Sequence, residues 1–444
     1  MIKIKTNNIH SKEKHYILET IFSDILGLKI AFESSEEKNY VIELPNKNKI
    51  IIPDKFLSSQ VDQKKWEKYE YPESSFNTNI KLKNNHSLFG IYGCEKYNIS
   101  DNTILIENDI IGTSFIFLSR IEELNNNQDK FGRYQFKYSL ADRFNIITRP
   151  VVNEYINFIK DSIIYLCPSL AFKKNEFKII LSHDIDSINK WSWKNLIKHA
   201  IYGLFKKDYL KKYLDYFHSK MNFKKDPFYN FNRIMNISES KKLNSLFLFM
   251  ALEKNEFDYR YPLKKIIPAI NEIKKRDNHN FGIHISKLAY NDLNRCSEEI
   301  SRLSKISKSK IIYSRQHYLM FDPKKTWAIL NANGIKYDLS LGYPEMPGFR
   351  CGICYPFKTF DIVEKKKLDL IEIPLIVMDV SILDYLKGVD FDIQLKKILK
   401  NVRKYDGLLN VLWHNDQFDS EQFKKNRNLF YSIIKNDSNS FFVL

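Results

Sequence analysis

The sequence predicts an α/β protein in which a smaller α+β domain precedes a distorted (β/α) barrel. Two observations carry this prediction. Short alternating apolar segments fill the first part of the chain, and apolar strands alternate with amphipathic helices in the rest. Repeated βα units imply a parallel sheet, and this many units favour closure into a barrel. We place the α+β domain, of unknown role, at residues 1–170 and the barrel at residues 171–444.

The elements of the first domain are predicted from hydrophobic periodicity and from the residues that end each segment. A helical period extends over 151–167 and ends at Pro168. Residues 109–124 are typical of a strand that runs into a helix, where Arg120, Glu122 and Glu123 form either a buried ion-pair cluster or a solvated helix face. The solvated face is the default interpretation. The predicted strands are 40–44, 49–52 and 103–106.

The barrel is predicted from strands and helices that alternate after residue 176. Between its first two strands lies an insertion, 191–231, that is rich in lysine and aromatic residues. The insertion could contact a membrane surface or a lipid-linked substrate. Packing of its aromatic faces on the barrel is the favoured alternative, because lysine is common throughout this chain. The predicted strands are 177–181, 246–252, 280–284, 310–315, 335–338, 368–377 and 408–413, and the predicted helices are 262–275, 292–307 and 323–333.

Composition excludes several classes of protein. With 444 residues, 43% hydrophobic content, 32 Phe and 26 Tyr, the chain can form globular cores and is not disordered. A net charge of +17 is typical of nucleic-acid-binding proteins, but the sequence has no Arg-rich arm, zinc-finger spacing or phosphate-binding loop. We therefore expect no nucleic-acid partner. The first residues lack the apolar segment of a secretory signal, which favours a cytoplasmic protein.

The five cysteines are odd in number and scattered, which argues against a disulfide framework. Cys351 and Cys354 have CxxC spacing, but no second pair completes a zinc site and the motif does not open a helix. We interpret them as structural cysteines in a loop.

The most informative stretch is 178–186, where an apolar strand ends in His183, Asp184 and Asp186. The carboxyl ends of strands are where α/β barrels place their chemistry, and ionisable groups there are costly to bury without partners or a metal. A helix cap explains one such residue but not all three. In an extended segment Asp184 and Asp186 point the same way, whereas His183 points to the other face. One carboxylate could then bind a metal while the other handles a proton.

Polar groups also follow other predicted strands. Carboxyl ends of parallel strands share one face of a barrel, so these groups should gather beside Asp184 and Asp186. Acids, imidazoles and a cation in one place are what a metal-assisted hydrolase requires. The groups are His284 with Ser286, Arg315 with His317, and His414 with Asn415 and Asp416.

These residues resemble the motifs of the polysaccharide deacetylase superfamily, also called NodB-homology or carbohydrate esterase family 4. The resemblance covers roughly residues 177–444 and includes motif order, and it implies a distorted (β/α) barrel of the NodB type. The divergent branch that the chain resembles carries an extra N-terminal domain, to which residues 117–123 are similar. The matching segments are 182–186, 282–286, 314–318 and 412–414, and the branch is indicated by 338–342, 348–352 and 371–374.

The resemblance implies a role for each matching residue. Asp184 is implied as the general base, Asp186 and His284 as metal ligands, Arg315 as the residue that orients the catalytic aspartate, and His414 as the general acid. The implied cofactor is a divalent metal, zinc, and the implied partner is a carbohydrate substrate.

One departure from the family pattern affects the metal. The second motif is usually His-x-x-x-His, but Leu288 stands four residues after His284. Two protein ligands would bind a metal weakly, since catalytic zinc sites normally have three and an open position. We predict that His317, where the family commonly has proline, supplies the third ligand. His183 is the other spare imidazole, but alternation turns it away.

The sequence therefore favours a metal-dependent hydrolase that removes an acyl group, expected to be acetyl, from a carbohydrate such as a surface-polysaccharide precursor. Asp184 would take a proton from water, and His414 would protonate the leaving group. The alternative is a non-catalytic carbohydrate-binding or assembly protein that retains the barrel. That alternative predicts no bound divalent metal and no loss of function in Asp184→Asn.

Overall fold

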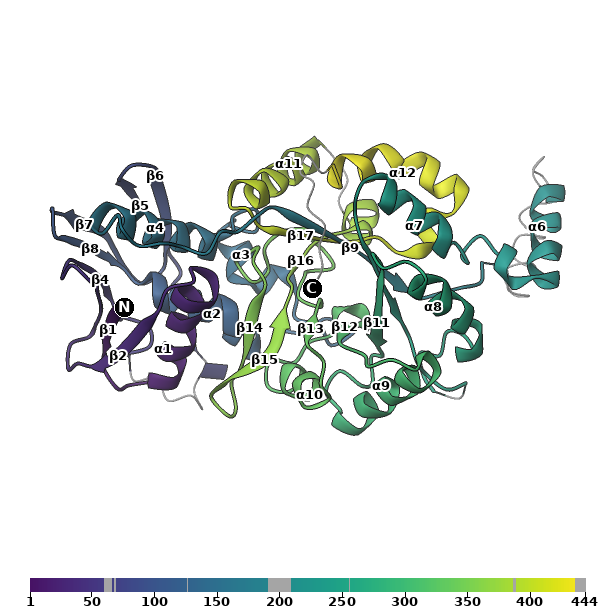
Figure 1. Cartoon of the computed structure of the whole chain (residues 1–444), viewed down its shortest axis with the longest axis horizontal. Helices are drawn as coiled ribbons and strands as arrows, with labels where there is room; N and C mark the ends of the chain where they lie inside the picture. The colour runs from purple at the N-terminus through teal and green to yellow at the C-terminus, as the bar shows by residue number, and fades with distance from the viewer. Residues whose placement is uncertain are drawn as a thin grey trace. The chain divides into compact units, whose positions relative to one another are not determined.

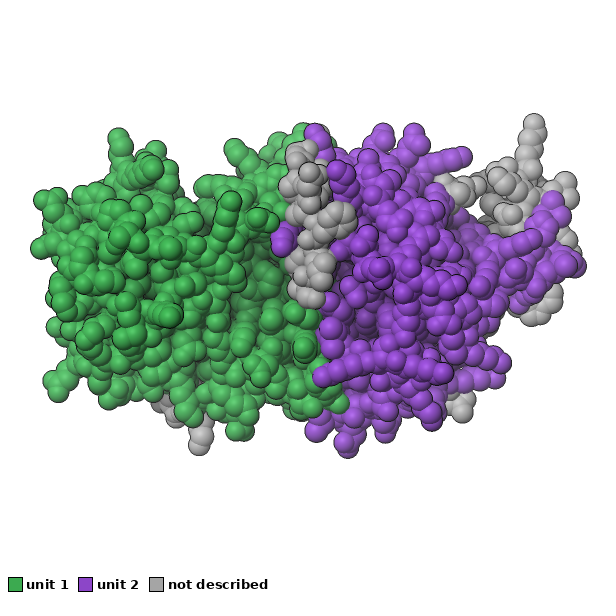
Figure 2. Space-filling model, in the orientation of Figure 1, with its two compact units in different colours: residues 1–177, 318–409 green, residues 178–317, 410–444 purple. Residues whose placement is uncertain are grey.

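The computed structural model describes residues 1–59, 66–67, 69–125, 127–190, 209–254, 256–385 and 389–435. The chain divides into two compact units, each built from two stretches of sequence (Figure 2). Unit 1 consists of residues 1–177 and 318–409, and unit 2 consists of residues 178–317 and 410–444. Residues 318–409, which the sequence assigned to the barrel, are thus compact with the first 177 residues. The domain division at residue 170 stays a prediction.

The first sheet of unit 1 has the strand order β2-β1-β3-β4-β8-β7 (Figure 1). Its register aligns apolar residues in one row: Ile4 opposes Ile42, Ile42 opposes Ile50, and Ile50 opposes Ile104. All four are completely buried, so the alternation seen in the sequence sets both the register and the core face. The strands are β1 (Ile2–Thr6), β2 (Ile30–Ser34), β3 (Asn39–Glu43), β4 (Lys49–Pro53), β7 (Gly93–Ile99) and β8 (Thr103–Asn108), and β5 (Phe76–Lys81) pairs with β6 (Asn85–Gly90) in a separate hairpin.

Helix α2 (Ile110–Ser119) lies at the centre of unit 1. All ten of its residues are buried, as expected of a helix that is apolar all round. Asp109 caps its amino end by accepting a hydrogen bond from Gly112 N at 2.8 Å. The helix contacts α1 (Ser11–Leu18) and α4 (Val151–Leu166), and the latter matches the helix predicted at 151–167.

The second stretch of unit 1 packs directly on the first. Tyr16 of α1 donates a hydrogen bond to Lys358 O at 2.9 Å, and its ring lies 4.7 Å from that of Phe360. Val152 N also donates to Gly352 O at 2.9 Å. Three strands of this stretch have the order β14-β15-β13. Its elements are α10 (Thr326–Ala332), β13 (Tyr337–Asp338), β14 (Phe357–Asp361), β15 (Lys366–Glu372), β16 (Leu375–Met378) and α11 (Val389–Lys404).

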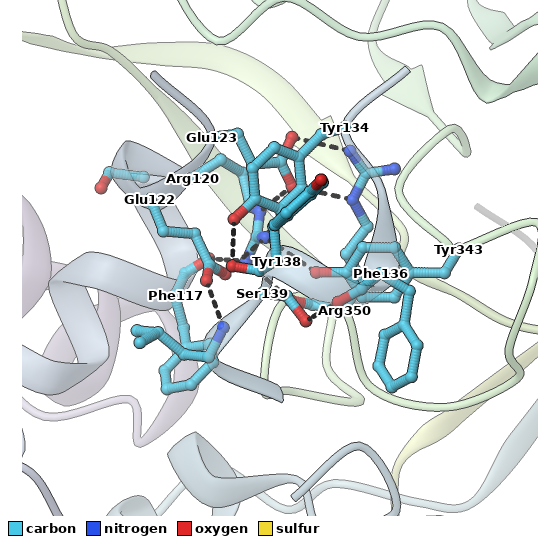
Figure 3. A network of polar contacts seen from close by, with 12 residues as sticks. Phe117, Arg120, Glu122, Glu123, Tyr134, Phe136, Tyr138, Ser139, Tyr343 and Arg350 are labelled. Carbon is cyan, nitrogen blue, oxygen red and sulfur yellow. Dashed lines mark hydrogen bonds and ion pairs between the residues drawn. The ribbon is translucent and has the colours of Figure 1, made fainter. Parts of the chain in front are cut away.

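Arg120, Glu122 and Glu123 form a buried cluster rather than a solvated helix face, so the default interpretation was wrong (Figure 3). Arg120 Nη2 donates to Glu122 Oε1 at 2.7 Å and to Glu123 Oε1 at 2.6 Å. Arg350, from the second stretch, donates to Glu123 Oε2 at 2.7 Å. The cluster is buried because a second arginine from a distant part of the sequence neutralises the second glutamate.

Unit 2 contains the parallel strands that carry the sequence motifs, in the order β12-β11-β10-β9-β17. Every residue of β9 after Lys178 is buried, which is typical of a strand covered on both faces. Helices α8 and α9 contact β11, and α7 contacts β10 (Figure 1). The elements are β9 (Lys178–Ile185), α6 (Tyr209–Met221), α7 (Phe231–Ser240), β10 (Ser245–Phe249), α8 (Ile267–Lys274), β11 (Asn280–Ile285), α9 (Leu293–Ser307), β12 (Tyr313–Gln316), β17 (Leu408–Leu412) and α12 (Ser420–Ile433).

The sheet of unit 2 curls. Three strand spacings separate β9 from β12, or about 14 Å in a flat sheet. Arg315 on β12 nevertheless donates to Asp184 on β9 at 2.7 Å. This curvature agrees with the mixed α/β class that the sequence predicts, whereas closure into a NodB-type barrel stays a prediction.

Other predictions meet the structure only in part. Residues 191–208 of the insertion lie outside the described residues, so its membrane or lipid-linked contact is untested. No helix in the described part of the chain is both long and apolar enough to cross a membrane. Cys351 and Cys354 are buried free cysteines, consistent with a structural role.

Candidate functional site

Asp184 and Arg315 form a buried ion pair in unit 2. Arg315 Nη1 donates to Asp184 Oδ1 at 2.7 Å, and Nη2 donates to Ser182 Oγ at 2.8 Å. Burial raises the pKa of Asp184, but the charge of Arg315, together with smaller contributions from His284 and His414, outweighs burial and holds the pKa below its usual value. The aspartate is therefore ionised at neutral pH. Its second oxygen, Oδ2, lies 3.6 Å from His284 Nε2.

The register of β11 places His284 beside Arg315. His284 pairs with Arg315 across β11 and β12, where Gly282 allows a close approach. A Cβ at Gly282 would lie 2.4 Å from Tyr313 O and 2.6 Å from Tyr313 Cβ. Neither atom can move away unless the backbone of β12 moves. Glycine at this position thus lets the two strands bring their polar ends together.

His183 lies on the opposite face of β9 from Asp184, as alternation predicts. Its Nδ1 is 2.7 Å from Trp413 O and its Nε2 is 3.1 Å from Ser245 Oγ. Burial lowers the pKa of His183 to about 3, so the ring is neutral at physiological pH. His183 is held by the core and does not enter the site.

Asp186, His284 and His317 converge at the carboxyl ends of β9, β11 and β12. Each contributes one potential ligand atom, and these atoms lie within 4.8 Å of one another. His284 Nε2 is 3.3 Å from Asp186 Oδ1, and His317 Nε2 is 3.8 Å from the same oxygen. Two imidazoles and one carboxylate are the donor types of catalytic zinc sites. The structure therefore brings together the three residues predicted as metal ligands.

The remaining ring nitrogens orient both imidazoles toward Asp186. His284 Nδ1 lies 3.0 Å from Arg315 O, and His317 Nδ1 lies 2.5 Å from Asp258 Oδ2. A ring that donates through Nδ1 presents a lone pair at Nε2, which is how metal-binding histidines are held. Asp186 Oδ1 is buried and faces the Nε2 nitrogens of both rings. Acceptor atoms that face one another in this way are stabilised by a positive charge between them, either a metal ion or a proton on an imidazole.

Asp258 is a residue of the site that the sequence interpretation missed. It lies in the loop between β10 and α8, at a left-handed φ of 78°, and Arg260 Nη2 donates to its other oxygen at 2.9 Å. No motif marks it. The available signal was its position in a loop after a parallel strand, where ligands gather in such folds.

His414 follows β17 and lies at the edge of the same group. Its Nε2 is 3.9 Å from Asp186 Oδ2, and its side chain is 16% exposed, so solvent and a substrate can reach it. The carboxylates of Asp184 and Asp186 also affect the other histidines. Burial lowers the pKa of His284, but the charge of Asp184 and then that of Asp186 raise it above its usual value. The site thus carries an excess of negative potential that favours a cation.

Two other polar residues at the strand ends have structural contacts instead. Ser286 Oγ donates to Glu299 Oε1 at 2.5 Å, which ties the end of β11 to α9. Asn415 Nδ2 donates to Ser187 O at 2.7 Å and to Phe228 O at 2.9 Å, which joins three loops. Leu288, at the place of the second family histidine, is 39% exposed.

Comparison with known proteins gives one family match for part of the chain and distant likenesses to solved structures. Residues 2–168 match the model of DUF7033, a family of unknown function. No curated protein matches the chain. Among solved structures, the chain is similar to a protein from Mycobacterium smegmatis assigned as a polysaccharide deacetylase, at 12% identity and a TM-score of 0.38, over 60% of this chain and 87% of that one.

Two further structures from bacilli are also similar. One is a CE4 family pseudoenzyme from Bacillus anthracis, at 10% identity and a TM-score of 0.28, over 58% of this chain and 63% of that one. The other is a polysaccharide deacetylase from Bacillus cereus, at 10% identity and a TM-score of 0.28, over 59% of this chain and 86% of that one. These likenesses are distant, at 10–12% identity.

Proposed function

We propose that this chain is a metal-dependent hydrolase that removes an acyl group, most simply acetyl, from a carbohydrate. The observation that carries the proposal is the convergence of Asp186, His284 and His317 beside the Asp184–Arg315 pair. The carbohydrate is inferred from the resemblance of the strand-end motifs to those of polysaccharide deacetylases. A cytoplasmic precursor of a surface polysaccharide is the substrate we favour.

The three ligand residues fit a zinc ion. They supply two imidazole nitrogens and a carboxylate oxygen, and Asp258 holds His317 as a neighbouring carboxylate typically holds a metal-bound histidine. Three protein ligands would leave one position of a tetrahedral ion open to water or substrate. A zinc ion held there would polarise the acyl carbonyl and make water easier to deprotonate.

The other residues divide the proton transfers between them. Asp184 is ionised and beside the ligand group, so it can accept the proton of the attacking water. Arg315 keeps this carboxylate charged and fixes its orientation, because it occupies Oδ1 and leaves Oδ2 toward His284. His414 is exposed enough to contact the leaving amine or alcohol and to donate a proton to it.

Metal content measured on four purified proteins tests the proposal. Full-length protein is dialysed against zinc, passed over a desalting column and analysed by mass spectrometry. We expect about one zinc per chain in the wild type. Asp186→Ala and His317→Ala should lose the metal, since even a partner of a ligand changes metal affinity by about 10- to 100-fold. His218→Ala, an exposed histidine of α6, is the matched control. Wild-type protein without stoichiometric zinc would contradict the proposal.

Acetate release from acetylated oligosaccharides then separates the hydrolase from the non-catalytic alternative. The exposed Leu288, in place of a family ligand, is the observation that favours the alternative. A hydrolase should release acetate with zinc bound, and Asp184→Asn should retain zinc while losing activity by at least about 100-fold. A protein that binds carbohydrate but neither retains zinc nor releases acetate would instead be a non-catalytic carbohydrate-binding protein.

A further inference from the structure

We propose that unit 1 contains a second ligand site, a carbohydrate-binding cavity lined by tyrosines. The cavity has a volume of about 660 Å³ and is formed by residues from 69–73, 122–125 and 134–143 together with Asn127. This volume lies within the range of small-molecule sites. Its lining residues all belong to unit 1, whereas the metal group belongs to unit 2. The inference therefore goes beyond the proposed hydrolase, none of whose reacting residues lines the cavity.

The lining of the cavity matches a sugar better than other ligands. Tyrosine combines a flat apolar face with a hydroxyl, so it can pack against the C–H face of a sugar ring and also bond to its hydroxyls. Amides and charged groups of both signs complete the walls. An apolar ligand would leave these polar groups desolvated without partners, whereas a polyol can bond to all of them. The aromatic and amide residues are Tyr69, Tyr71, Tyr134, Tyr138, Asn125 and Asn127.

Tyr71 gives independent support for a ligand. It lines the cavity, is only 9% exposed, and its hydroxyl has no hydrogen-bond partner among the described residues. The ring of Tyr69 stands edge-on to it at 5.2 Å and fixes its position. A buried hydroxyl without a partner destabilises the protein, and a ligand hydroxyl that reaches it after a small movement of the lining would provide that partner.

Hydrogen bonds within the protein hold two of the lining side chains in place. Glu122 lines the cavity and is held on both oxygens, by Arg120 Nη2 at 2.7 Å and by Leu140 N at 2.9 Å. Tyr134 donates its hydroxyl to Tyr138 O at 2.8 Å, and Figure 3 shows both tyrosines beside the Arg120 network. A wall fixed by buried ion pairs loses little entropy when a ligand binds.

Tyr138 supplies a surface on which a sugar ring can stack. It lines the cavity but is 43% exposed, and Lys137 Nζ lies 4.8 Å from its ring centre. Tyr97, on β7, has nearly the same exposure of 44% but does not line the cavity. The two residues therefore form a matched pair for mutation.

The test is binding of tagged full-length protein to an array of defined oligosaccharides built from hexoses, N-acetylhexosamines and uronic acids. Glycans that the wild type retains are then titrated against variants by calorimetry. We expect Tyr138→Ala and Tyr71→Phe each to weaken binding by roughly tenfold, since a lost stacking surface or hydrogen bond has that order of effect. Tyr97→Ala should bind as the wild type does. Circular dichroism checks that each variant is folded.

Asp186→Ala separates this inference from the proposed hydrolase. It should lose zinc yet bind the same glycans through unit 1, so failure of either proposal leaves the other standing. The inference is overturned if no glycan is retained, if Tyr138→Ala and Tyr97→Ala bind equally, or if glycan binding disappears with Asp186→Ala.

Discussion

Glu123→Gln is the substitution whose effect on stability can be worked out most directly from the structure. Glu123 accepts hydrogen bonds from Nε and Nη2 of Arg120 at 2.9 and 2.6 Å, and from Nε and Nη2 of Arg350 at 2.9 and 2.7 Å. Arg120 is completely buried and Arg350 is 2% exposed. Glutamine keeps the size of the side chain but removes its charge. It also turns an NH₂ group toward guanidinium donors.

The magnitude follows from the charge of the cluster. Two arginines are balanced by Glu122 and Glu123, so the variant leaves one buried guanidinium charge without compensation. Removal of one partner from a buried ion pair costs about 3–5 kcal/mol. We therefore expect the free energy of unfolding of unit 1 to fall by about 3–5 kcal/mol, a large part of the stability of a typical domain.

Urea denaturation monitored by circular dichroism and tryptophan fluorescence measures this loss. Glu33→Gln is the matched control, because Glu33 pairs with Lys3 at 2.7 Å with both side chains more than a third exposed. An exposed pair contributes less than about 1 kcal/mol. Adding Arg350→Met to Glu123→Gln removes the uncompensated charge, so the double variant should lose less than the sum of the single losses. Equal losses for Glu123→Gln and Glu33→Gln would refute the reasoning.

Three further predictions concern unit 2. The pKa of His183 in the folded protein, about 3, is below the value in the unfolded chain, so its contribution to stability is present above about pH 6.5 and is lost toward pH 3, by about 1.4 kcal/mol per pH unit. Urea titrations across that range should show a steeper decline of stability for the wild type than for His183→Asn. Parallel declines would contradict the assignment. Asp258→Asn should weaken zinc binding by about 10- to 100-fold, measured by chelator competition, because His317 loses the carboxylate that orients it; unchanged affinity would exclude that role. Gly282→Ala should destabilise unit 2 and reduce zinc binding together, since its Cβ would meet Tyr313 O at 2.4 Å; zinc content and thermal melting of the same samples would show whether the two effects separate.

Predictions from short-range pattern agree closely with the structure. The strand that ends at Ile185, the helix at 151–167 and three of the six strands of the first sheet were visible as an apolar run, helical period or alternation. Alternation also separated His183 from Asp184, since neighbouring residues of a strand face opposite sides. The selection of His317 as a third potential ligand came from its place after a strand, and the structure puts it beside Asp186.

Predictions that depended on residues far apart in the sequence agreed less well with the structure. The Arg120 cluster was assigned to solvent because the sequence near it holds one arginine and two glutamates. Its burial depends on Arg350, which no local pattern connects to it. Asp258 was missed for the same reason, since its partner His317 is distant in sequence and follows strand β12. The compact pairing of residues 318–409 with the first 177 residues likewise has no short-range signature.

The sequence by itself determined which side chains stand at the ends of strands and which face each takes, because strand alternation is a property of neighbouring residues. Only the tertiary structure decided that Asp186, His284 and His317 meet, that Arg315 reaches Asp184, and that Arg120 is buried. Those contacts depend on how far the sheet curls and on which loop returns to which edge. Such long-range packing is the sum of many weak interactions across the chain, so no single segment of sequence encodes it.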